Sequence, residues 1–239
     1  MKIIAMIPAR YAATRFPAKL MQVLGNKPVI RHTYDATVDT GLFEEVWVVT
    51  DSSVIYDEIT RHGGRAVMSK HTHESGSDRI AEAIADMDVD VVINVQGDEP
   101  FIRKEPLEKL VRLFDDPTVQ VGSLMRRITT RAEIDSSSCV KVVVNQKKDA
   151  LYFSRSVIPY HANLEIAAAH YLHIGVYGFR KETLLRFTQW PQSTIEQTEK
   201  LEQLRYLDHG VAIRMAEVDF LSVAIDTPED LDKAKRLLT

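Results

Sequence analysis

Three cations, Arg10, Arg15 and Lys19, lie within ten residues near the start of the chain, and no acidic residue stands among them. The apolar run over residues 2–7 ends at a proline and predicts a short, buried first strand. Open α/β sheets bind their ligands at the carboxyl ends of strands. We therefore expect the first loop, residues 8–19, to bind a polyphosphate through its charges and its backbone N–H groups.

The first loop matches neither of the two common glycine-rich phosphate motifs. The sequence contains no G-x-G-x-x-G and no G-x-x-x-x-G-K-[ST], which disfavours a dinucleotide site and a P-loop. A solvated basic loop is the simplest interpretation of any one of these cations. Three of them at the end of one strand favour the binding role.

Acidic residues follow two other apolar runs. Asp98 and Glu99 come shortly after the β-branched run 91–95, where Gly97 is expected to permit a sharp turn, and this carboxylate pair would face the same edge as the first loop. A further acid, Asp226, follows Ile225 near the carboxyl terminus. Magnesium binds through one or two carboxylates together with phosphate oxygens. The pattern predicts Mg²⁺ beside the polyphosphate, although Asp226 could instead cap the last helix.

A polar loop over residues 70–79 leads into an expected helix at 78–86, with Ser77 as a possible cap. The free N–H groups at this helix start could hold an anion or the edge of a base. His71 and His73 resemble metal ligands by composition, but their spacing is not that of a zinc site, and we disfavour metal binding there.

Composition excludes several broad classes. The formal charge of −4 gives no long-range attraction to nucleic acid or to an anionic membrane. Cys139 is the only cysteine, so no intrachain disulfide forms, and a small packed residue is a better interpretation than a nucleophile. No apolar run approaches the roughly 18 to 20 residues that cross a bilayer. We expect a soluble, cytoplasmic protein whose first residues form a strand rather than a leader.

Strand and helix patterns alternate through the first half of the chain, which predicts βαβ units and a mainly parallel sheet. The expected strands are residues 2–7, 45–50, 65–68 and 91–94, and the expected helices are 28–40, 53–62 and 78–86. The run 91–95 does not alternate, as a strand covered on both faces requires.

The second half is richer in strand patterns and predicts a small subdomain with mixed strands. Its expected strands are residues 119–126, 140–145, 150–153 and 171–179, and its expected helices are 181–187 and 199–208. Thr227 and Pro228 open a last helix as N-cap and first residue.

The motifs above, taken together, closely resemble the 3-deoxy-manno-octulosonate cytidylyltransferases. The principal matching segments are IPARY at 7–11, TRFPAK at 14–19, SGSDR at 75–79, NVQGDEP at 94–100 and DTPED at 226–230. Further matches are VKVV at 140–143, ALYFSRSVIP at 150–159, HIGVYGFR at 173–180 and LEQLR at 201–205. The likeness therefore runs through nearly the whole chain in order.

The resemblance implies a fold, a domain organisation and a reaction. The fold is an α/β, Rossmann-like nucleotidyltransferase fold with a mixed, mainly parallel central sheet and a small β-rich subdomain. Within a single domain of residues 1–239, the nucleotide-binding portion would span about 1–125 and 210–239. The portion at about 126–209 would bind the sugar and form a homodimer. The reaction would transfer CMP from CTP to the anomeric hydroxyl of 3-deoxy-manno-octulosonate (Kdo) with Mg²⁺, for bacterial lipopolysaccharide synthesis.

The resemblance also assigns roles to residues. The catalytic residues would be Lys19, Asp98 and Asp226, of which the two aspartates would bind magnesium. The nucleotide would contact Pro8, Ala9, Arg10, Arg15, Lys19, Ser75, Gly76 and Arg79. The sugar would contact Gln96, Arg155, His173, Tyr177, Glu202 and Gln203.

The assignment of Arg155 to the sugar also has a physical rationale. Arg155 would pair with the sugar carboxylate, because an anionic substrate needs one fixed cation. Glu199, Glu202, Gln203 and Tyr206 would share one face of the helix expected at 199–208. On sequence alone such a face is typical of a solvated surface, and only the resemblance favours sugar binding there.

The chain departs from the family pattern in its first loop. The family's P-G-K-P is Pro17-Ala18-Lys19-Leu20 here, and its serine is Ala13. A methyl group at Ala18 adds bulk where a phosphate or a turn with positive φ needs room. Two alternatives therefore stay open: the same chemistry on 8-amino-Kdo or a sialic acid, or a homologue that binds CTP with impaired catalysis.

Overall fold

A computed structural model describes residues 1–12, 16–73, 75–163, 165–219 and 224–238. The chain forms two compact units. The first unit combines Met1–Leu107 with Ser222–Thr239, and the second is Glu108–Leu221. Both units contain strands and helices.

The first unit is built on four parallel strands. β1 (Ile3–Ala9) lies between β6 (Val91–Asn94) and β4 (Glu45–Thr50), and β5 (Ala66–Met68) pairs with β4. The predicted strands of the first half are therefore all confirmed, with shifts of one or two residues at their ends. Val91, Val92 and Ile93 are fully buried, which explains why this strand reads as a continuous apolar run.

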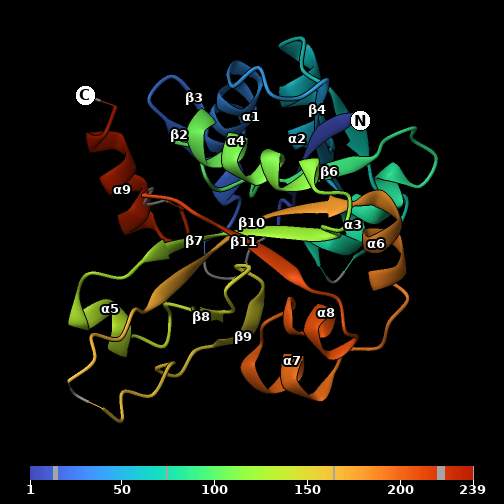
Figure 1. Cartoon of the computed structure of the whole chain (residues 1–239). Coiled ribbons are helices and arrows are strands. Elements are labelled where there is room, and N and C mark those ends of the chain that lie inside the picture. The colour runs from blue at the N-terminus through green and yellow to red at the C-terminus, as the bar shows by residue number, and fades with distance from the viewer. Residues whose placement is uncertain (13–15, 74, 164, 220–223, 239) are drawn as a thin grey trace. The chain divides into compact units, whose positions relative to one another are not determined.

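Helices of the first unit cover these strands. α1 (Val29–Asp39), α2 (Ser53–Arg61) and α3 (Gly76–Ile84) pack against β1, β4 and β5 (Figure 1). Between β1 and α1 the chain forms a short 3₁₀ helix, η1 (Lys19–Met21), and a hairpin of β2 (Val23–Leu24) and β3 (Lys27–Pro28). The loops that carry the candidate residues therefore begin at the carboxyl ends of the parallel strands.

Two helix starts show how capping fixes the site loops. The N-cap of α3 is Ser75, whose hydroxyl accepts from the N–H of Asp78, so the expectation of a cap at Ser77 was wrong. Ser77 is buried instead. α9 (Pro228–Arg236) begins as predicted, with Thr227 and Asp230 forming a capping box. The cap is thus Thr227, which leaves the carboxylate of Asp226 for other partners.

The second unit contains mixed strands. β7 (Val121–Arg127) runs parallel to β11 (Ile213–Glu217) and antiparallel to β10 (Tyr171–Arg180). β8 (Lys141–Val144) is antiparallel to both β10 and β9 (Ala150–Ser154). The predicted β-rich second half is confirmed, whereas β11 was missed.

Helices of this second half differ more from expectation. α6 (Lys181–Phe187) is where the pattern placed it, and α5 (Arg131–Asp135) was not expected. Earlier in the chain, α4 (Lys104–Arg112) was also missed. A helix over 199–208 was wrong, because Lys200 takes a left-handed conformation with φ of 54° and ends α7 (Thr194–Glu199).

This break separates the residues that were expected to share a helical face. The following helix, α8 (Leu204–Asp208), starts only after Gln203. An ion pair between Arg205 and Glu196, both almost fully buried, joins the two short helices with an N–O distance of 2.5 Å. Tyr206 stacks on Phe187, with ring centroids 4.2 Å apart. The two helices are therefore held by tertiary contacts rather than by continuous helical hydrogen bonds.

Candidate active site

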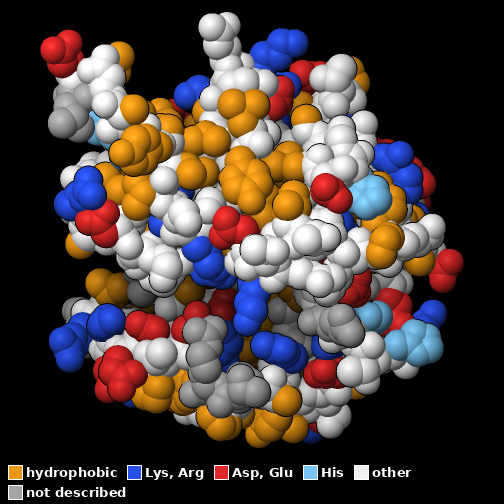
Figure 2. Space-filling model, turned by 90° about the horizontal axis from the view of Figure 1, so that it is seen from below, with side chains coloured by type: hydrophobic (Ala, Val, Ile, Leu, Met, Phe, Trp, Pro, Cys, Tyr) orange, Lys and Arg blue, Asp and Glu red, His pale blue; other side chains and the backbone are white. Residues whose placement is uncertain are grey.

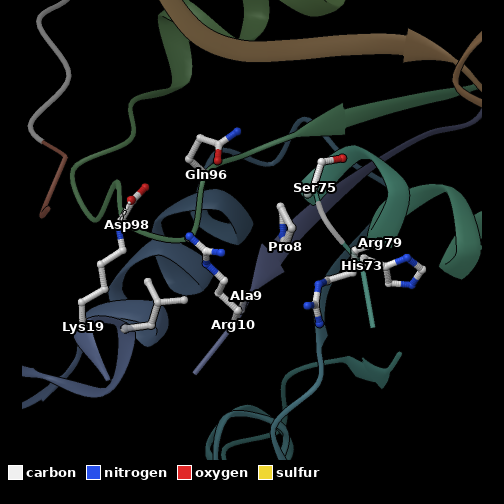
Figure 3. Close-up of a pocket in the computed structure, with 12 residues that line it drawn as sticks. Pro8, Ala9, Arg10, Lys19, His73, Ser75, Arg79, Gln96 and Asp98 are labelled. Carbon is white, nitrogen blue, oxygen red and sulfur yellow. Dashed lines mark hydrogen bonds and ion pairs between the residues drawn. The ribbon is translucent and has the colours of Figure 1, made fainter. Parts of the chain in front are cut away.

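A cavity of about 250 Å³ lies in the first unit, at the carboxyl ends of its parallel strands. Its walls come from the end of β1 and the residue after it, from η1, from the start of α3 and the residues before it, and from the turn after β6. The lining residues are Pro8, Ala9, Arg10, Lys19, Leu20, His73, Ser75, Gly76, Arg79, Gln96, Gly97 and Asp98. Figure 3 shows these residues around the hollow, with nine of them labelled. Every residue predicted to contact the nucleotide lines this cavity, except Arg15, which lies outside the described residues.

Lys19 joins the two predicted metal ligands. Its Nζ donates to Oδ2 of Asp98 and, over 2.8 Å, to Oδ1 of Asp226. The lysine side chain is 17% exposed. Burial alone lowers the pKa of Lys19, but the charges and hydrogen bonds of Asp98 and Asp226 outweigh it and raise that pKa above its usual value. The ammonium is therefore firmly charged in this position.

Backbone geometry brings the side chains of Lys19 and the two aspartates together. Ala18, the N-cap of η1, has φ of 50° and ψ of 31°, so the departure from glycine falls on a left-handed residue. The N–H of Ile225 donates to the carbonyl of Asp98 over 2.9 Å, which ties the two acidic segments together. The expected need for positive φ at residue 18 is thus confirmed, and alanine accommodates it at some cost in strain.

Glycine at position 97 serves close packing. A Cβ there would stand 3.1 Å from the carbonyl oxygen of Pro8 and 3.2 Å from Ile30. The hydroxyl of Thr33 on α1 also donates to the carbonyl of Gly97 over 2.9 Å. Gly97 was expected to permit a sharp turn, but close approach to the end of β1 is the feature that excludes a side chain.

Arg79 is held in place by residues that the sequence did not point to. Its guanidinium donates to Asp51 over 2.7 Å and to Ser69 over 3.0 Å, and the residue is only 4% exposed. Asp51 directly follows β4, and Asp98 lies in the turn after β6. Its position after a strand end was the signal that could have identified it.

His73 lines the cavity and pairs with a side chain of α3. Its Nε2 lies 3.0 Å from Oε2 of Glu82, which also accepts from the N–H of Lys70 over 2.9 Å. Burial raises the pKa of Glu82, but the hydrogen bonds from His73 and Lys70 outweigh it and leave the pKa below its usual value. His73 therefore pairs with an ionised carboxylate of α3.

Among the described residues, no three histidine, cysteine or acidic side chains gather to form a metal site. Asp98 and Asp226 nevertheless fit magnesium, because both carboxylates lie within hydrogen-bond reach of one nitrogen. Magnesium takes one or two carboxylates and fills its other positions with water and phosphate oxygens. The donor set therefore suits a metal that arrives with a phosphate ligand.

The residues predicted to contact the sugar are divided between the two units. Gln96 lines the cavity of the first unit, whereas the others belong to the second. In that second unit His173 and Gln203 meet, with 3.4 Å between Nδ1 and Nε2, and His173 stacks obliquely with Tyr177 at 5.3 Å between ring centroids. Glu202 is near enough to Tyr177 to act on it electrostatically.

Hydrogen bonds define the protonation of His173. The hydroxyl of Ser123 donates to the carbonyl of Val176 over 2.9 Å, so its oxygen accepts from Nε2 of His173 over 3.0 Å. Nδ1 is then free to accept from the amide of Gln203. Burial lowers the pKa of His173 to about 3, and burial together with the charge of Glu202 raises that of Tyr177 well above its usual value. The side chains of His173 and Tyr177 are therefore both neutral at physiological pH.

Arg155 makes extensive contacts with the backbone. Its guanidinium donates to the carbonyls of Glu199, Ser137 and Lys200 over 2.9, 3.1 and 3.4 Å. The carboxylate of Glu199 in turn accepts from the N–H of Arg155 over 3.0 Å. Pairing of Arg155 with a sugar carboxylate stays a prediction, and the contacts seen here organise the end of α7.

Comparison with known proteins identifies the family. The sequence profile of the cytidylyltransferase family matches residues 4–213. A 3-deoxy-manno-octulosonate cytidylyltransferase from Flavobacterium johnsoniae is 56% identical over 241 residues, covering 100% of this chain and 99% of that protein. This chain belongs to the 3-deoxy-manno-octulosonate cytidylyltransferase family. The Escherichia coli member is 42% identical, with 99% of this chain and 96% of that protein covered.

Solved structures agree with membership of the cytidylyltransferase family. A CMP:2-keto-3-deoxy-manno-octonic acid synthetase complexed with CTP superimposes with a TM-score of 0.95 at 41% identity, covering 100% of this chain and 98% of the other. The 4-diphosphocytidyl-2C-methyl-D-erythritol synthase of Anaerococcus prevotii shares the fold alone, with a TM-score of 0.67 at 16% identity, and 99% of this chain and 98% of the other are covered. The predicted α/β nucleotidyltransferase fold with a mixed, mainly parallel sheet is confirmed.

Proposed function

We propose that this chain transfers CMP from CTP to the anomeric hydroxyl of 3-deoxy-manno-octulosonate, releasing pyrophosphate. The reaction would supply CMP-Kdo for lipopolysaccharide synthesis in the cytoplasm, where CTP is made. The observation that carries the proposal is the cavity in which Arg10, Lys19 and the N-terminus of α3 surround one hollow beside Asp98. The relatives named above, similar over their full lengths, support the choice of nucleotide and sugar.

The cavity residues have distinct tasks in this proposal. Arg10 and Lys19 would neutralise the triphosphate, and the N–H groups of Ser75 and Gly76 would hold the nucleotide at a helix start. Arg79, already oriented by Asp51 and Ser69, would contact the nucleotide without reorganisation. Displacement at phosphorus needs positioning and charge neutralisation more than a covalent nucleophile. Pro8, Ala9 and the undescribed Arg15 complete the proposed nucleotide set.

Magnesium is the proposed cofactor, and Asp98 and Asp226 would hold it. When bound, a divalent cation supplies neutralisation of the charge that develops on the phosphate oxygens. The two aspartates contribute its protein ligands and, through the tie between Ile225 and Asp98, a fixed separation. Gln96, Arg155, His173, Tyr177, Glu202 and Gln203 stay the proposed sugar contacts.

Pyrophosphate release tests the proposal directly. Purified protein with CTP and Mg²⁺ is expected to release pyrophosphate fastest with Kdo, and more slowly with 8-amino-Kdo or a sialic acid. A faster rate with either of these sugars would change the assigned substrate. Tight CTP binding by calorimetry with no turnover on any sugar would support an impaired homologue instead. Omission of the sugar and omission of the metal serve as controls.

We also propose that the protein is a homodimer through its second unit. Leu151, Tyr160 and Ile166 are 61%, 87% and 63% exposed, which is unusual for large apolar side chains within one short stretch. Figure 2 shows hydrophobic side chains gathered into a patch in the upper half of the view. A second copy of the chain would cover Leu151, Tyr160 and Ile166.

Sedimentation tests the dimer. Leu151→Asp should convert a dimer into a monomer while the folded far-UV spectrum is kept. Val54 is 49% exposed at the start of α2 in the first unit, so Val54→Asp is the matched control and should stay dimeric. A wild-type protein that sediments as a monomer at micromolar concentration would overturn the proposal.

A further inference from the structure

Asp98 and Asp226, which hold a divalent cation if the proposed function is right, already have a cation of the chain between them. The ammonium of Lys19 donates to both Asp98 and Asp226 in this structure. The carboxylates assigned to the metal are therefore already neutralised in part by a cation of the chain itself. A second cation cannot take the same oxygen atoms while this ammonium stays on them.

The same lysine also belongs to the phosphate cavity. Lys19 lines the hollow together with Arg10 and Ser75, and its side chain is only 17% exposed. It emerges from η1 directly after the left-handed Ala18, so its backbone is fixed and its four-carbon side chain is the adjustable part. One ammonium thus has two sets of anionic partners within reach of one anchored residue: the carboxylates, and a phosphate group in the cavity.

We propose that Lys19 is the resident counter-cation of Asp98 and Asp226, and that a divalent cation displaces it toward the triphosphate. One ammonium against two carboxylates leaves a single negative charge, whereas a divalent cation balances both. Both cations on the pair together would be repelled by their like charges. Each displacement frees a positive charge where the nucleotide binds, so metal and CTP strengthen each other's binding by the same factor.

This exchange has a consequence for the protein without nucleotide. A free metal ion must compete with Lys19 and gains no phosphate ligand in return, so it binds weakly. CTP gives the displaced ammonium a new partner and removes that competition. The pair Asp98 and Asp226 is therefore closed to adventitious divalent cations until the nucleotide is present.

Manganese binding to the nucleotide-free protein tests the exchange, with free Mn²⁺ followed by electron paramagnetic resonance. Lys19→Met should bind Mn²⁺ more tightly than wild type by about tenfold or more, because it removes the competing charge from the carboxylates. Lys27→Met is the matched control, since Lys27 pairs with Asp35 over 2.5 Å at similar exposure. It should bind Mn²⁺ as wild type does.

A second pair of variants guards against misfolding and nonspecific sites. Lys19→Gln keeps a polar side chain and should show the same gain, while Lys19→Met with Asp98→Asn should lose it. Equal or weaker Mn²⁺ binding by folded Lys19→Met or Lys19→Gln overturns the exchange. The test is independent of turnover: absence of CMP transfer would remove the proposed reaction, whereas an unchanged Mn²⁺ affinity in an active enzyme would remove only the exchange.

Discussion

Two lysines, one in each unit, show how partners decide what a buried cation does. Lys19 lies between two carboxylates beside a cavity, and its pKa is raised because these partners outweigh burial. Lys141 on β8 is fully buried, and its Nζ donates to the carbonyls of Ser136, Cys139 and Arg155 over 2.9, 2.7 and 2.6 Å. Burial lowers the pKa of Lys141, and no carboxylate bonds to its ammonium to reverse this among the contacts described.

The difference separates a functional cation from a structural one. Carboxylate partners of Lys19 can accept another cation in its place, so the contact is exchangeable. The carbonyl partners of Lys141 fix a loop and the backbone of Arg155, and they need a donor at all times. We therefore expect substitution of the carboxylate partners of Lys19 to change activity and substitution of Lys141 to change stability.

Lys141→Met should give the largest effect, and it tests the structural role of Lys141. Loss of the ammonium leaves three carbonyls without their donor, which should lower the free energy of unfolding by about 3 kcal/mol or more. Urea unfolding followed by circular dichroism measures it. The exposed Lys147 provides the control, and Lys147→Met should change stability by less than about 0.5 kcal/mol. An equal effect of the two substitutions would contradict the structural role.

Asp98→Asn tests the functional role of the carboxylate pair beside Lys19. Substitutions in the outer shell of metal sites cost about 10- to 100-fold, so loss of a ligand should lower kcat by at least about a hundredfold. The melting temperature should change little, because Asp98 is part of an exchangeable pair at the cavity edge. Initial rates of pyrophosphate release and a thermal melt measure both quantities. An unchanged rate would remove Asp98 from the site.

The lowered pKa of His173 predicts that the stability of the fold depends on pH. Its value is about 3 in the folded chain against an ordinary 6.5, so the unfolded chain binds the extra proton as pH falls below 6.5. The contribution of His173 to stability is therefore complete above pH 6.5 and is lost as pH falls toward 3. Between pH 7 and pH 5 the loss should reach about 2 kcal/mol.

Comparison with His173→Gln isolates this contribution. Urea unfolding at pH 7 and pH 5 should show a smaller pH dependence for the variant than for wild type. Equal dependence in the two proteins would mean that His173 is not held neutral by its surroundings. The result sharpens the contrast with Lys19, whose partners keep it charged.

Ala18→Gly should give the smallest effect. Relief of the left-handed strain at φ of 50° should outweigh the greater freedom of glycine in the unfolded chain and stabilise the protein by about 0.5 to 1 kcal/mol. Thermal unfolding measures it. Ala12 has no positive φ, so Ala12→Gly should give no stabilisation. If Ala18→Gly also lowers stability, the strain at this residue is absent in solution.

Sequence patterns predicted the first unit well because its strands are continuous apolar runs ended by polar loops. They failed at residues 199–208, where a periodic polar pattern resembled a helix but Lys200 turned the chain. Ser75 and Ser77 are both good caps by composition, and only the packing of α3 decides between them. Local propensity is thus sufficient where burial is uniform and insufficient where a tertiary contact ends an element.

The candidate site was predictable only as separate pieces. Lys19 and Asp226 are 207 residues apart in the chain, and no periodicity relates them. The rule that strand ends face the ligand placed Asp98 near the first loop, and it would equally have placed Asp51. That a lysine joins the two aspartates is a property of the folded chain, since it depends on η1 and on the tie between Ile225 and Asp98.

Product analysis tests the central claim most directly. Purified protein incubated with CTP, Kdo and Mg²⁺ should yield one CMP-Kdo for each pyrophosphate, identified by mass spectrometry and by its phosphorus spectrum. Kdo with the other three nucleoside triphosphates should yield far less product. Pyrophosphate without a CMP-sugar, or no pyrophosphate at all, would contradict the assignment of this chain as a CMP-Kdo-forming enzyme.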